Sequence, residues 1–404
     1  MRQLLRQGWT ALEAVLPLLL WPLNQVLAIM LRRRVVADSV LHVCFPFHIV
    51  HYTVELLRLR GFNADYVAVG GDPDWKLCDF HFQRWRKWMP LALTEFWFFW
   101  RVVSRYQTVQ FHFMQGISRS GWEWPVLKRL GRKIVVYYSG CEARDWRRNM
   151  ALHPEINICQ DCDYGRDLCS NALSVKRRML SRRFADLEMI TTPDLRDFIP
   201  GAIHFPFFSP PENIVPERNR PHWPDNGCLR IVHVTNHPGI EGTARIAATV
   251  ERLRTRGHSV EFRHLRGVPY DRVLRELADA DLSVGKMKMG FYANAQIEAL
   301  CCGVPTITHI RPDLTPQAIS VTGLMFSSLD QLEGDIERLL GHAEELAAMR
   351  RDGPAAIRAL HDNDDLTDRL IALYRELHRG RRTGDLQAWS GLRPRPNAIG
   401  AGLR

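Results

Sequence analysis

Short apolar runs alternate with amphipathic stretches along this chain, and the alternation predicts strands that are each followed by a helix. Such runs are typical of buried parallel strands, and apolar residues three or four positions apart are typical of helices that cover a sheet. In the first half the predicted strands are 40–45, 64–69, 109–113, 133–138 and 189–192. In the second half they are 230–234, 260–265, 281–284 and 305–308. The pattern predicts an α/β protein with two doubly wound, Rossmann-like parallel sheets.

The length of 404 residues is sufficient for two domains. A stretch rich in Pro and Asn, 209–226, interrupts the alternation and predicts a linker. We therefore expect an N-terminal domain over 37–208 and a C-terminal domain over 227–380. The tail at 381–404 has little apolar periodicity and is predicted to be disordered. Because ligands bind at the carboxyl ends of parallel strands, the expected site is the cleft between the two facing sheets.

The N-terminal segment, 1–36, carries an apolar stretch between Arg2 and Arg6 on one side and the arginines at 32–34 on the other. It contains two prolines and no small-residue cleavage site, which argues against a cleavable signal and against a straight spanning helix. We expect an amphipathic helix that lies on an anionic membrane surface, on the inner, cytoplasmic face. A bilayer span and a helix packed on the protein itself stay open as alternatives.

The net charge is +10, with 54 Lys and Arg against 44 Asp and Glu. A positive surplus of this size favours anionic partners such as sugar nucleotides, nucleic acid or acidic lipid, and it does not choose among them. No nucleic-acid-binding motif is present, so we do not expect nucleic acid as a partner.

The most specific pattern lies at 290–305, where the sequence is GFYANAQIEALCCGVP. A glycine opens a loop, a helix with Glu298 follows, and the helix ends in a Gly-Val-Pro turn. Upstream, 233–243 has the sequence HVTNHPGIEGT and leads into another helix. In order and spacing these elements resemble the donor site of the retaining family 4 glycosyltransferases, which have the GT-B fold. The resemblance implies transfer of a sugar from a nucleoside-diphosphate-sugar donor, with no cofactor required.

The same resemblance assigns the donor contacts. It places Glu298 on the ribose hydroxyls and the start of its helix, near Ala293, on the diphosphate. The predicted donor-binding residues are Glu298, Gly290, Tyr292, Ala293, Asn294, Lys286, Lys288 and His237. An exposed helix carboxylate is the alternative for Glu298, and solvated side chains are the alternative for the two lysines.

The chain departs from the family pattern at two places. The first glutamate of the family's E-x7-E pair is replaced by Gly290. The family's basic phosphate-binding residues are replaced by His237 and Glu241, and Lys286 and Lys288 are the candidates to supply the missing charge. An altered donor and a loss of activity both remain open.

In the first half, His112 ends a predicted strand where related enzymes have a histidine beside the transferred sugar. The turn at 139–144, SGCEAR, resembles the family's HGSD-x-R turn. We predict His112 and Glu142 as catalytic residues, and His48 and Arg144 as acceptor-side residues. A core histidine is the alternative for His112. Catalysis would depend on positioning and on stabilising the departing diphosphate.

Four of the nine cysteines form a separate group. Cys159, Cys162 and Cys169 have the spacing C-x2-C-x6-C, and Cys141 or His153 could supply a fourth ligand. A structural zinc on Cys141, Cys159, Cys162 and Cys169, an iron–sulfur cluster and no metal at all are the three alternatives. A closed four-ligand site would pin a loop and would take no part in transfer.

The sequence thus predicts a glycosyltransferase that transfers a sugar to a lipid-linked or polysaccharide acceptor, with retention. The alternative is a catalytically silent GT-B protein that binds a glycan or a partner enzyme at the membrane.

Overall fold

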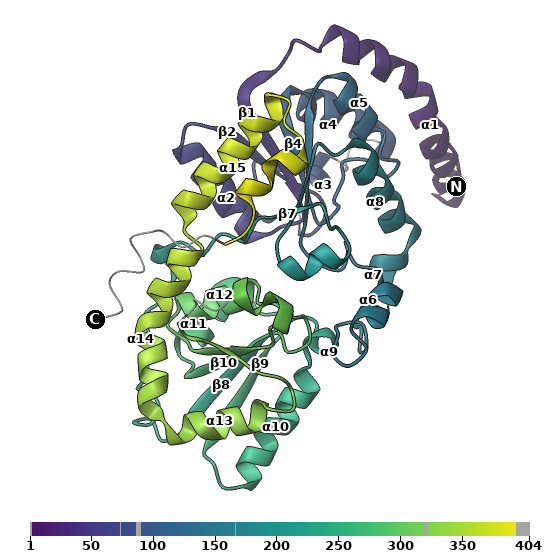
Figure 1. The fold of residues 1–404 in the computed structure, drawn as a ribbon. Coiled ribbons are helices and arrows are strands. Elements are labelled where there is room, and N and C mark those ends of the chain that lie inside the picture. The colour runs from purple at the N-terminus through teal and green to yellow at the C-terminus, as the bar shows by residue number, and fades with distance from the viewer. Residues whose placement is uncertain (1, 73, 86–89, 166, 318–321, 393–404) are drawn as a thin grey trace.

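The computed structural model contains two parallel sheets, one in each half of the chain, with helices around both (Figure 1). It describes residues 2–72, 74–85, 90–165, 167–317 and 322–392, of which 2–14, 167 and 315–317 are described by their backbone alone. The α/β prediction of two doubly wound units is confirmed.

The first sheet has the strand order β3-β2-β1-β4-β5-β6-β7, and every pairing is parallel. Its strands are β1 Val36–Cys44, β2 Asn63–Ala68, β3 Phe80–His81, β4 Tyr106–His112, β5 Lys133–Tyr138, β6 Leu187–Ile190 and β7 Ile203–His204. Its helices are α2 His48–Leu59, α3 Phe82–Trp85, α4 Leu91–Arg101, α5 Glu123–Arg129, α6 Trp146–Leu152, α7 Asp167–Ser170 and α8 Ala172–Phe184. Strands β4 and β5 are almost wholly buried, and β1 is buried from Ser39 to Cys44, because helices cover both faces.

The second sheet has the order β12-β11-β10-β8-β9, again with all strands parallel. Its strands are β8 Leu229–Val234, β9 Val260–Leu265, β10 Leu282–Val284, β11 Thr306–Thr308 and β12 Leu324–Phe326. Its helices are α9 Pro238–Glu241, α10 Thr243–Thr255, α11 Tyr270–Ala278, α12 Asn294–Cys301, α13 Leu332–Gly341 and α14 Ala343–Leu360. Residues 209–226 connect the two sheets, and their end packs around the buried carboxylate of Asp281.

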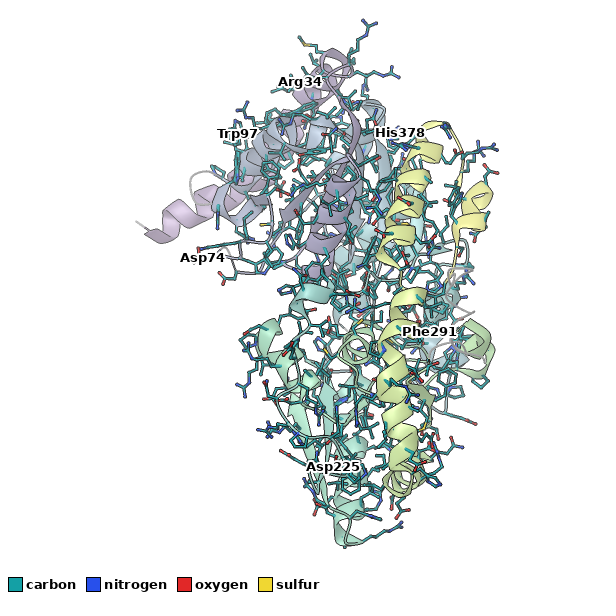
Figure 2. All side chains as sticks on the ribbon, turned by 90° about the vertical axis from the view of Figure 1, so that its left-hand side faces the viewer. Arg34, Asp74, Trp97, Asp225, Phe291 and His378 are labelled. Carbon is teal, nitrogen blue, oxygen red and sulfur yellow. The ribbon has the colours of Figure 1, made fainter. Side chains whose placement is uncertain are left out.

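Helix α15, Asn363–His378, crosses back and packs on the first sheet. The sequence pattern predicts these residues as part of the second domain, 227–380. Its Tyr374 hydroxyl donates to Gln110 Oε1 at 2.6 Å, and Arg60, which follows α2, pairs with Asp364 at 2.6 Å. Figure 2 shows His378 beside the first domain and Phe291 at the level where the two domains meet. The apolar stripe of α15 joins the core cluster that contains the buried face of α2.

The prediction of a disordered tail is wrong for residues 381–392. A 3-10 helix, Thr383–Trp389, follows α15, and its Leu386 is buried. Ser390 Oγ accepts hydrogen bonds from the Arg196 side chain and from the backbone of His204. A few anchoring contacts thus order a segment that lacks periodicity. Residues 393–404 lie outside the described residues.

The N-terminal helix α1, Arg2–Met30, lies over α4 and α5. Trp100 donates to Asn24 Oδ1 at 2.8 Å, and Arg129 donates to Gln25 Oε1 at 2.8 Å. The outward side chains are exposed and apolar: Val15, Leu18, Leu19, Trp21, Leu23, Val26, Ile29 and Met30. Within the described range, no helix has both the length and the apolar character that crossing a bilayer requires. One face of α1 packs on the protein, and the other presents apolar surface.

Candidate functional site

Loops at the carboxyl ends of both sheets meet between the domains. One of them, residues 157–165, follows α6 in the first domain and reaches the second domain beside α9 (Figure 1). We call it the acidic loop because it contributes Asp161 and Asp163 to this contact. A cavity of about 150 Å³ lies between this loop, the turn that carries Gly239, and Lys288.

The carboxylates of the acidic loop bind cationic and N–H groups of the second domain. Asp161 pairs with the Lys288 ammonium at 2.6 Å, and the Lys288 side chain is only 4% exposed. Asp163 accepts from the backbone N–H of Gly239 at 2.9 Å and from that of Ile240 at 3.4 Å. The groups that could bind an anion at this point therefore already hold carboxylates.

The other predicted basic contacts are engaged in the same way. Lys286 forms an ion pair with the buried Glu241, so Glu241 neutralises a lysine at this turn. His237 Nε2 lies 2.6 Å from the Tyr164 hydroxyl of the acidic loop, and burial lowers the pKa of His237. The structure thus brings Lys286, Lys288 and His237 to one turn, each with a partner.

Glu298 lies on α12 in a wall to which both domains contribute. Residues from the two sides line this wall: Ile49, Tyr52, Phe208, Pro210, Tyr270, Asn294, Ile297 and Glu298. Burial raises the pKa of Glu298 to about 7, against the smaller opposite effect of the neighbouring Tyr270 phenol. Asn294 Oδ1 is buried and has no hydrogen-bond partner among the described residues. A carboxyl group and an unsatisfied amide oxygen thus face the same closed space.

His48 reaches the same wall from the first domain, as expected for the loop after β1. Its ring stacks on Tyr270 of α11, with centroids 4.3 Å apart. Burial lowers the pKa of His48, so the ring is neutral at physiological pH. Tyr270 joins the two sides of the cleft, and the sequence motifs did not identify it.

Gly290, at the position of the missing glutamate, is required by backbone geometry and by packing. Its φ is +92°, and an added Cβ would lie 2.7 Å from Cγ of Arg311. The Arg311 guanidinium pairs with Asp197 of the first domain and lies 2.8 Å from His153 Nε2. The Arg311 side chain therefore occupies the space beside Gly290 and links the domains.

Two other predicted donor residues have structural roles. The Tyr292 hydroxyl lies 3.0 Å from His361 Nε2, and His361 Nδ1 lies 2.7 Å from the Phe207 carbonyl oxygen. Ala293 caps α12, and its N–H donates to Gln296 Oε1. Tyr292 packs inside the core that joins the domains, and the N–H of Ala293 is already satisfied.

His112 lies inside the first domain. Its Nε2 is 2.9 Å from His42 Nδ1 and 3.2 Å from Gln110 Nε2. Burial lowers the pKa of both His112 and His42, with a smaller effect of Arg58 on His42. The placement corresponds to the core-histidine alternative, and a catalytic role for His112 stays a prediction.

Glu142 and Arg144 also lie in buried positions. The Glu142 carboxylate accepts from the backbone N–H groups of Ser139 and Gly140 within its own turn, and burial raises its pKa. Arg144 forms a buried ion pair with Asp194 and lines a narrow interdomain pocket together with Gly290 and Arg311. Glu142 holds the shape of the turn, whereas Arg144 lies at the cleft.

The four cysteines of the predicted metal group lie near the acidic loop. Burial raises the pKa of the Cys141 thiol to about 11, against the lowering effect of Arg144 and with smaller raising effects of Glu142, Cys159 and Cys162. Asn149 Nδ2 lies 3.3 Å from Cys159 Sγ. His153 is already bound to Asp197 and Arg311. Across the part of the chain that the structure describes, no group of three His, Cys, Asp or Glu side chains is arranged to hold a metal. The zinc site stays a prediction.

Sequence reasoning missed several residues of this site, namely Asp161, Asp163, Tyr164, Tyr270 and Arg311. The first three lie within or just after the C-x2-C motif. That motif indicates thiol ligands for a metal, and it does not indicate that the neighbouring carboxylates bind another domain. The partners of these residues are far away in sequence.

Comparisons with known proteins support the fold. No protein-family model matches the chain, and no curated protein matches it. The sucrose-phosphate synthase of Thermosynechococcus elongatus superposes with a TM-score of 0.57 at 13% identity, over 85% of this chain and 100% of that one. The catalytic domain of starch synthase IV from Arabidopsis thaliana, bound to ADP and acarbose, gives 0.53 at 11% identity, over 83% and 100%.

A putative UDP-N-acetylglucosamine 2-epimerase from Listeria monocytogenes gives a TM-score of 0.50 at 14% identity, over 86% of this chain and 99% of that one. The chain therefore has the two-domain GT-B fold, as the sequence predicts. Because a transferase and an epimerase both match, the fold by itself does not define the reaction.

Substitution of Gly290 tests how tightly this part of the cleft is packed. We expect Gly290→Ala to lower the free energy of unfolding by about 1–3 kcal/mol, because it combines a left-handed backbone with a clash against Arg311. Gly334→Ala is the control, since that glycine lies in α13 with open space around it, and the change should be neutral or stabilising. Urea denaturation measures both, and equal effects would contradict the packing argument.

Proposed function

We propose that the protein is a glycosyltransferase that transfers a sugar from a nucleoside-diphosphate-sugar donor to a lipid-linked or polysaccharide acceptor, with retention. The observation that supports this most directly is the pair formed by Glu298 and the unsatisfied Asn294 Oδ1, which line one wall between the two sheets. A carboxylate there can accept hydrogen bonds from the two hydroxyls of a ribose.

The donor diphosphate would exchange with the carboxylates of the acidic loop. Lys288 is buried, and leaving its ammonium without an anion would be costly. A diphosphate can replace both carboxylates at once, because it carries several acceptor oxygens for Lys288 and for the N–H groups of Gly239 and Ile240. Release of Asp161 and Asp163 would loosen the contact between the domains and open the cleft.

The first domain would supply the acceptor side through His48 and Arg144, which lie at the cleft. Catalysis would depend on holding donor and acceptor together and on stabilising the departing diphosphate. In this proposal the acceptor hydroxyl attacks the anomeric carbon on the face from which the diphosphate leaves, and the diphosphate takes both the electron pair of the broken bond and the proton of the hydroxyl. His112 and Glu142 would hold the ends of β4 and β5 in position.

The exposed apolar face of α1 would place the enzyme on an anionic membrane, where a lipid-linked acceptor is found. The face includes Leu18 and Leu19, which are 74% and 66% exposed, and Arg32 to Arg34 follow the helix. Apolar side chains that enter the headgroup layer together with nearby arginines are typical of peripheral attachment. The inner, cytoplasmic face of the membrane is part of this proposal.

A catalytically silent protein that binds a glycan or a partner enzyme is the second candidate. It is favoured by Gly290, where Arg311 occupies the space beside the position of the family's sugar-contacting acid. The two candidates differ in one measurement, namely transfer of a labelled sugar from donor to acceptor.

Glu298→Gln tests the donor site. We expect the variant to bind the best nucleoside diphosphate of a UDP, GDP and ADP panel about tenfold more weakly, because a charged acceptor to the ribose is lost. The Glu298 carboxylate forms only as the pH rises through about 7. The affinity of the wild type for the nucleotide should therefore increase between about pH 6 and about pH 8, and by more than deprotonation of the nucleotide phosphate accounts for. The variant should lack this extra increase in titration calorimetry.

Glu344→Gln, an exposed helix carboxylate of the same domain, is the matched control and should bind as the wild type does. Donor-dependent transfer that Glu298→Gln abolishes would exclude the silent alternative. Binding without transfer to any lipid-linked or glycan acceptor would support it. No nucleotide binding at all would contradict the proposed donor site.

Asp163→Asn tests the exchange between the acidic loop and the donor. We expect it to tighten nucleoside diphosphate binding by about threefold to tenfold, because the ligand no longer displaces a charged carboxylate from Gly239 and Ile240. Glu155→Gln, an exposed residue that lines the same cavity, should leave the affinity unchanged. Weaker binding of Asp163→Asn would mean that the loop holds the donor.

A Leu18→Glu, Leu19→Glu double variant tests the membrane proposal. We expect the fraction bound to anionic phospholipid vesicles in a flotation assay to fall by about tenfold or more, because two apolar contacts are replaced by negative charges. Leu59→Glu is the control, since Leu59 is 77% exposed on α2 and away from α1. Equal binding of both variants and the wild type would contradict the proposal.

A further inference from the structure

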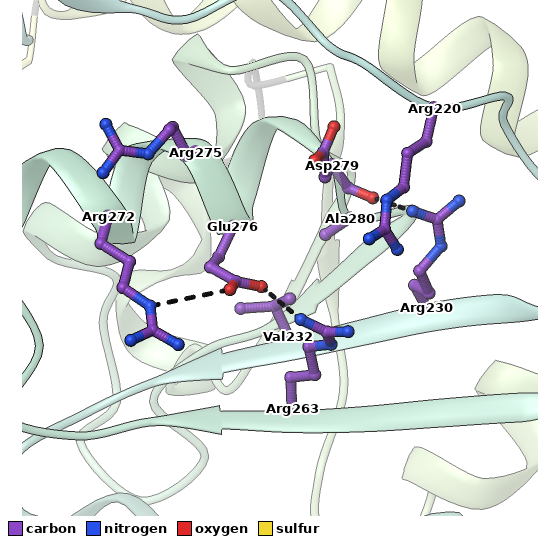
Figure 3. A pocket seen from close by; sticks show the side chains of 9 residues that line it. All are labelled: Arg220, Arg230, Val232, Arg263, Arg272, Arg275, Glu276, Asp279 and Ala280. Atoms are coloured by element: carbon purple, nitrogen blue, oxygen red, sulfur yellow. Dashed lines mark hydrogen bonds and ion pairs between the residues drawn. The ribbon is translucent and has the colours of Figure 1, made fainter.

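A second cavity, of about 330 Å³, lies in the second domain away from the residues of the cleft (Figure 3). It is bounded by α11, by strands β8 and β9, and by Arg220 of the segment that connects the domains. Arg230, in its wall, is the second residue of β8, whereas the turn with Gly239 follows the other end of that strand. The cavity therefore begins at the end of the sheet opposite to the proposed donor site.

The wall of this cavity has more positive than negative groups. Five arginines line it against two carboxylates, those of Glu276 and Asp279. Arg263 pairs with Glu261 at 2.7 Å and with Glu276 at 2.8 Å, whereas Arg272 lies 3.9 Å from Glu276. Arg272 thus has only a long contact, to a carboxylate that is already bound to Arg263, and the dashed lines in Figure 3 mark both contacts of Glu276.

Of the remaining arginines of the wall, Arg275 pairs with Asp271 at 2.5 Å, whereas Arg230 and Arg220 have no ion pair shorter than 3.8 Å with a carboxylate that the structure describes. Arg230 donates to the backbone carbonyls of Asp279 and Pro221. The carboxylate of Asp281 lies 3.8 Å from the Arg230 guanidinium and is bound more closely by Arg218, at 2.6 Å. The Arg220 side chain makes no hydrogen bond or ion pair with any residue that the structure describes.

The guanidinium groups also approach the cavity from different sides. Figure 3 shows Arg272 and Arg275 on α11, Arg263 on β9, and Arg220 with Arg230 at the far end. A planar carboxylate presents its two oxygens in one direction, whereas tetrahedral phosphates present oxygens in several directions. Guanidinium groups bind phosphate through paired N–H donors, so this distribution favours phosphate.

We propose that this cavity binds a compact, multiply charged phosphate-bearing anion, with diphosphate as the simplest example. The volume lies within the range of about 300–1,000 Å³ that is typical of small-molecule sites. The proposal concerns a site separate from the donor cleft, and it does not rest on the proposed glycosyltransferase activity.

Inorganic pyrophosphate is the probe that tests this proposal, and hydrogen exchange shows where it binds. We expect pyrophosphate to protect the amides of α11 and β9 and to bind the wild type in titration calorimetry. An Arg220→Gln, Arg272→Gln double variant should bind at this site about tenfold or more weakly, because two phosphate contacts are lost. Both side chains lie at the surface and have few partners, so the fold should persist.

A control with the same loss of charge is Arg256→Gln, Arg351→Gln, on exposed side chains of the second domain outside this cavity and outside the donor cavity. It should retain the protection of α11 and the affinity of the wild type. Three results would each overturn the proposal: equal loss of affinity in both double variants, protection confined to the cleft loops, and no protection of α11 at millimolar pyrophosphate. Equally strong binding of citrate would show that the site recognises charge alone and would contradict the preference for phosphate.

Discussion

The closed arrangement of the two domains depends on carboxylates of the first domain that neutralise buried cations of the second. Lys288 is almost wholly buried, and its ammonium is paired with Asp161. Arg311, also largely buried, is paired with Asp197. A buried charge without a partner is strongly unfavourable, so these pairs hold the domains together at the cleft. These pairs lie beside the apolar core that both domains share, which includes Phe207 and Tyr292.

This constraint explains the small residues at the contact. At Gly239 an added Cβ would lie 2.2 Å from the backbone oxygen of Asp161, so the acidic loop can approach only because a side chain is missing. At Gly290 the stem of Arg311 occupies the corresponding space. A ligand that carries its own negative charges can replace the carboxylates of the acidic loop. Binding of such an anion and opening of the cleft would then occur together, because the cations exchange their carboxylate partners for the anion.

Helix α11 connects two regions with different chemistry. Its first residue, Tyr270, stacks on His48 and lies beside Glu298 at the cleft. Its next turns carry Arg272, Arg275 and Glu276, which line the arginine-rich cavity. One short helix thus contributes its first residue to the cleft and its next turns to the arginine-rich cavity.

The sequence by itself determined the two parallel sheets and the helix that carries Glu298. Runs of buried apolar residues and a glycine-bounded helix are local features, and the structure has nearly the same bounds for the strands at 133–138 and 260–265. Strands β3 and β7 were not predictable, because two residues do not establish a period, and the three-residue strand β12 was also missed. The C-terminal helix was predictable as a helix, but an apolar stripe does not specify the sheet on which it packs.

Only the tertiary structure decided whether the cationic side chains of the site are already paired with carboxylates. Lys286 and Lys288 were predicted as free cations for a phosphate, yet their carboxylate partners lie 45 and 127 positions away in the chain. The space beside Gly290 is likewise filled by Arg311, which follows another strand of the same sheet. Local sequence specifies which side chains can bind an anion. Whether those side chains are already neutralised depends on chain segments that only folding brings together.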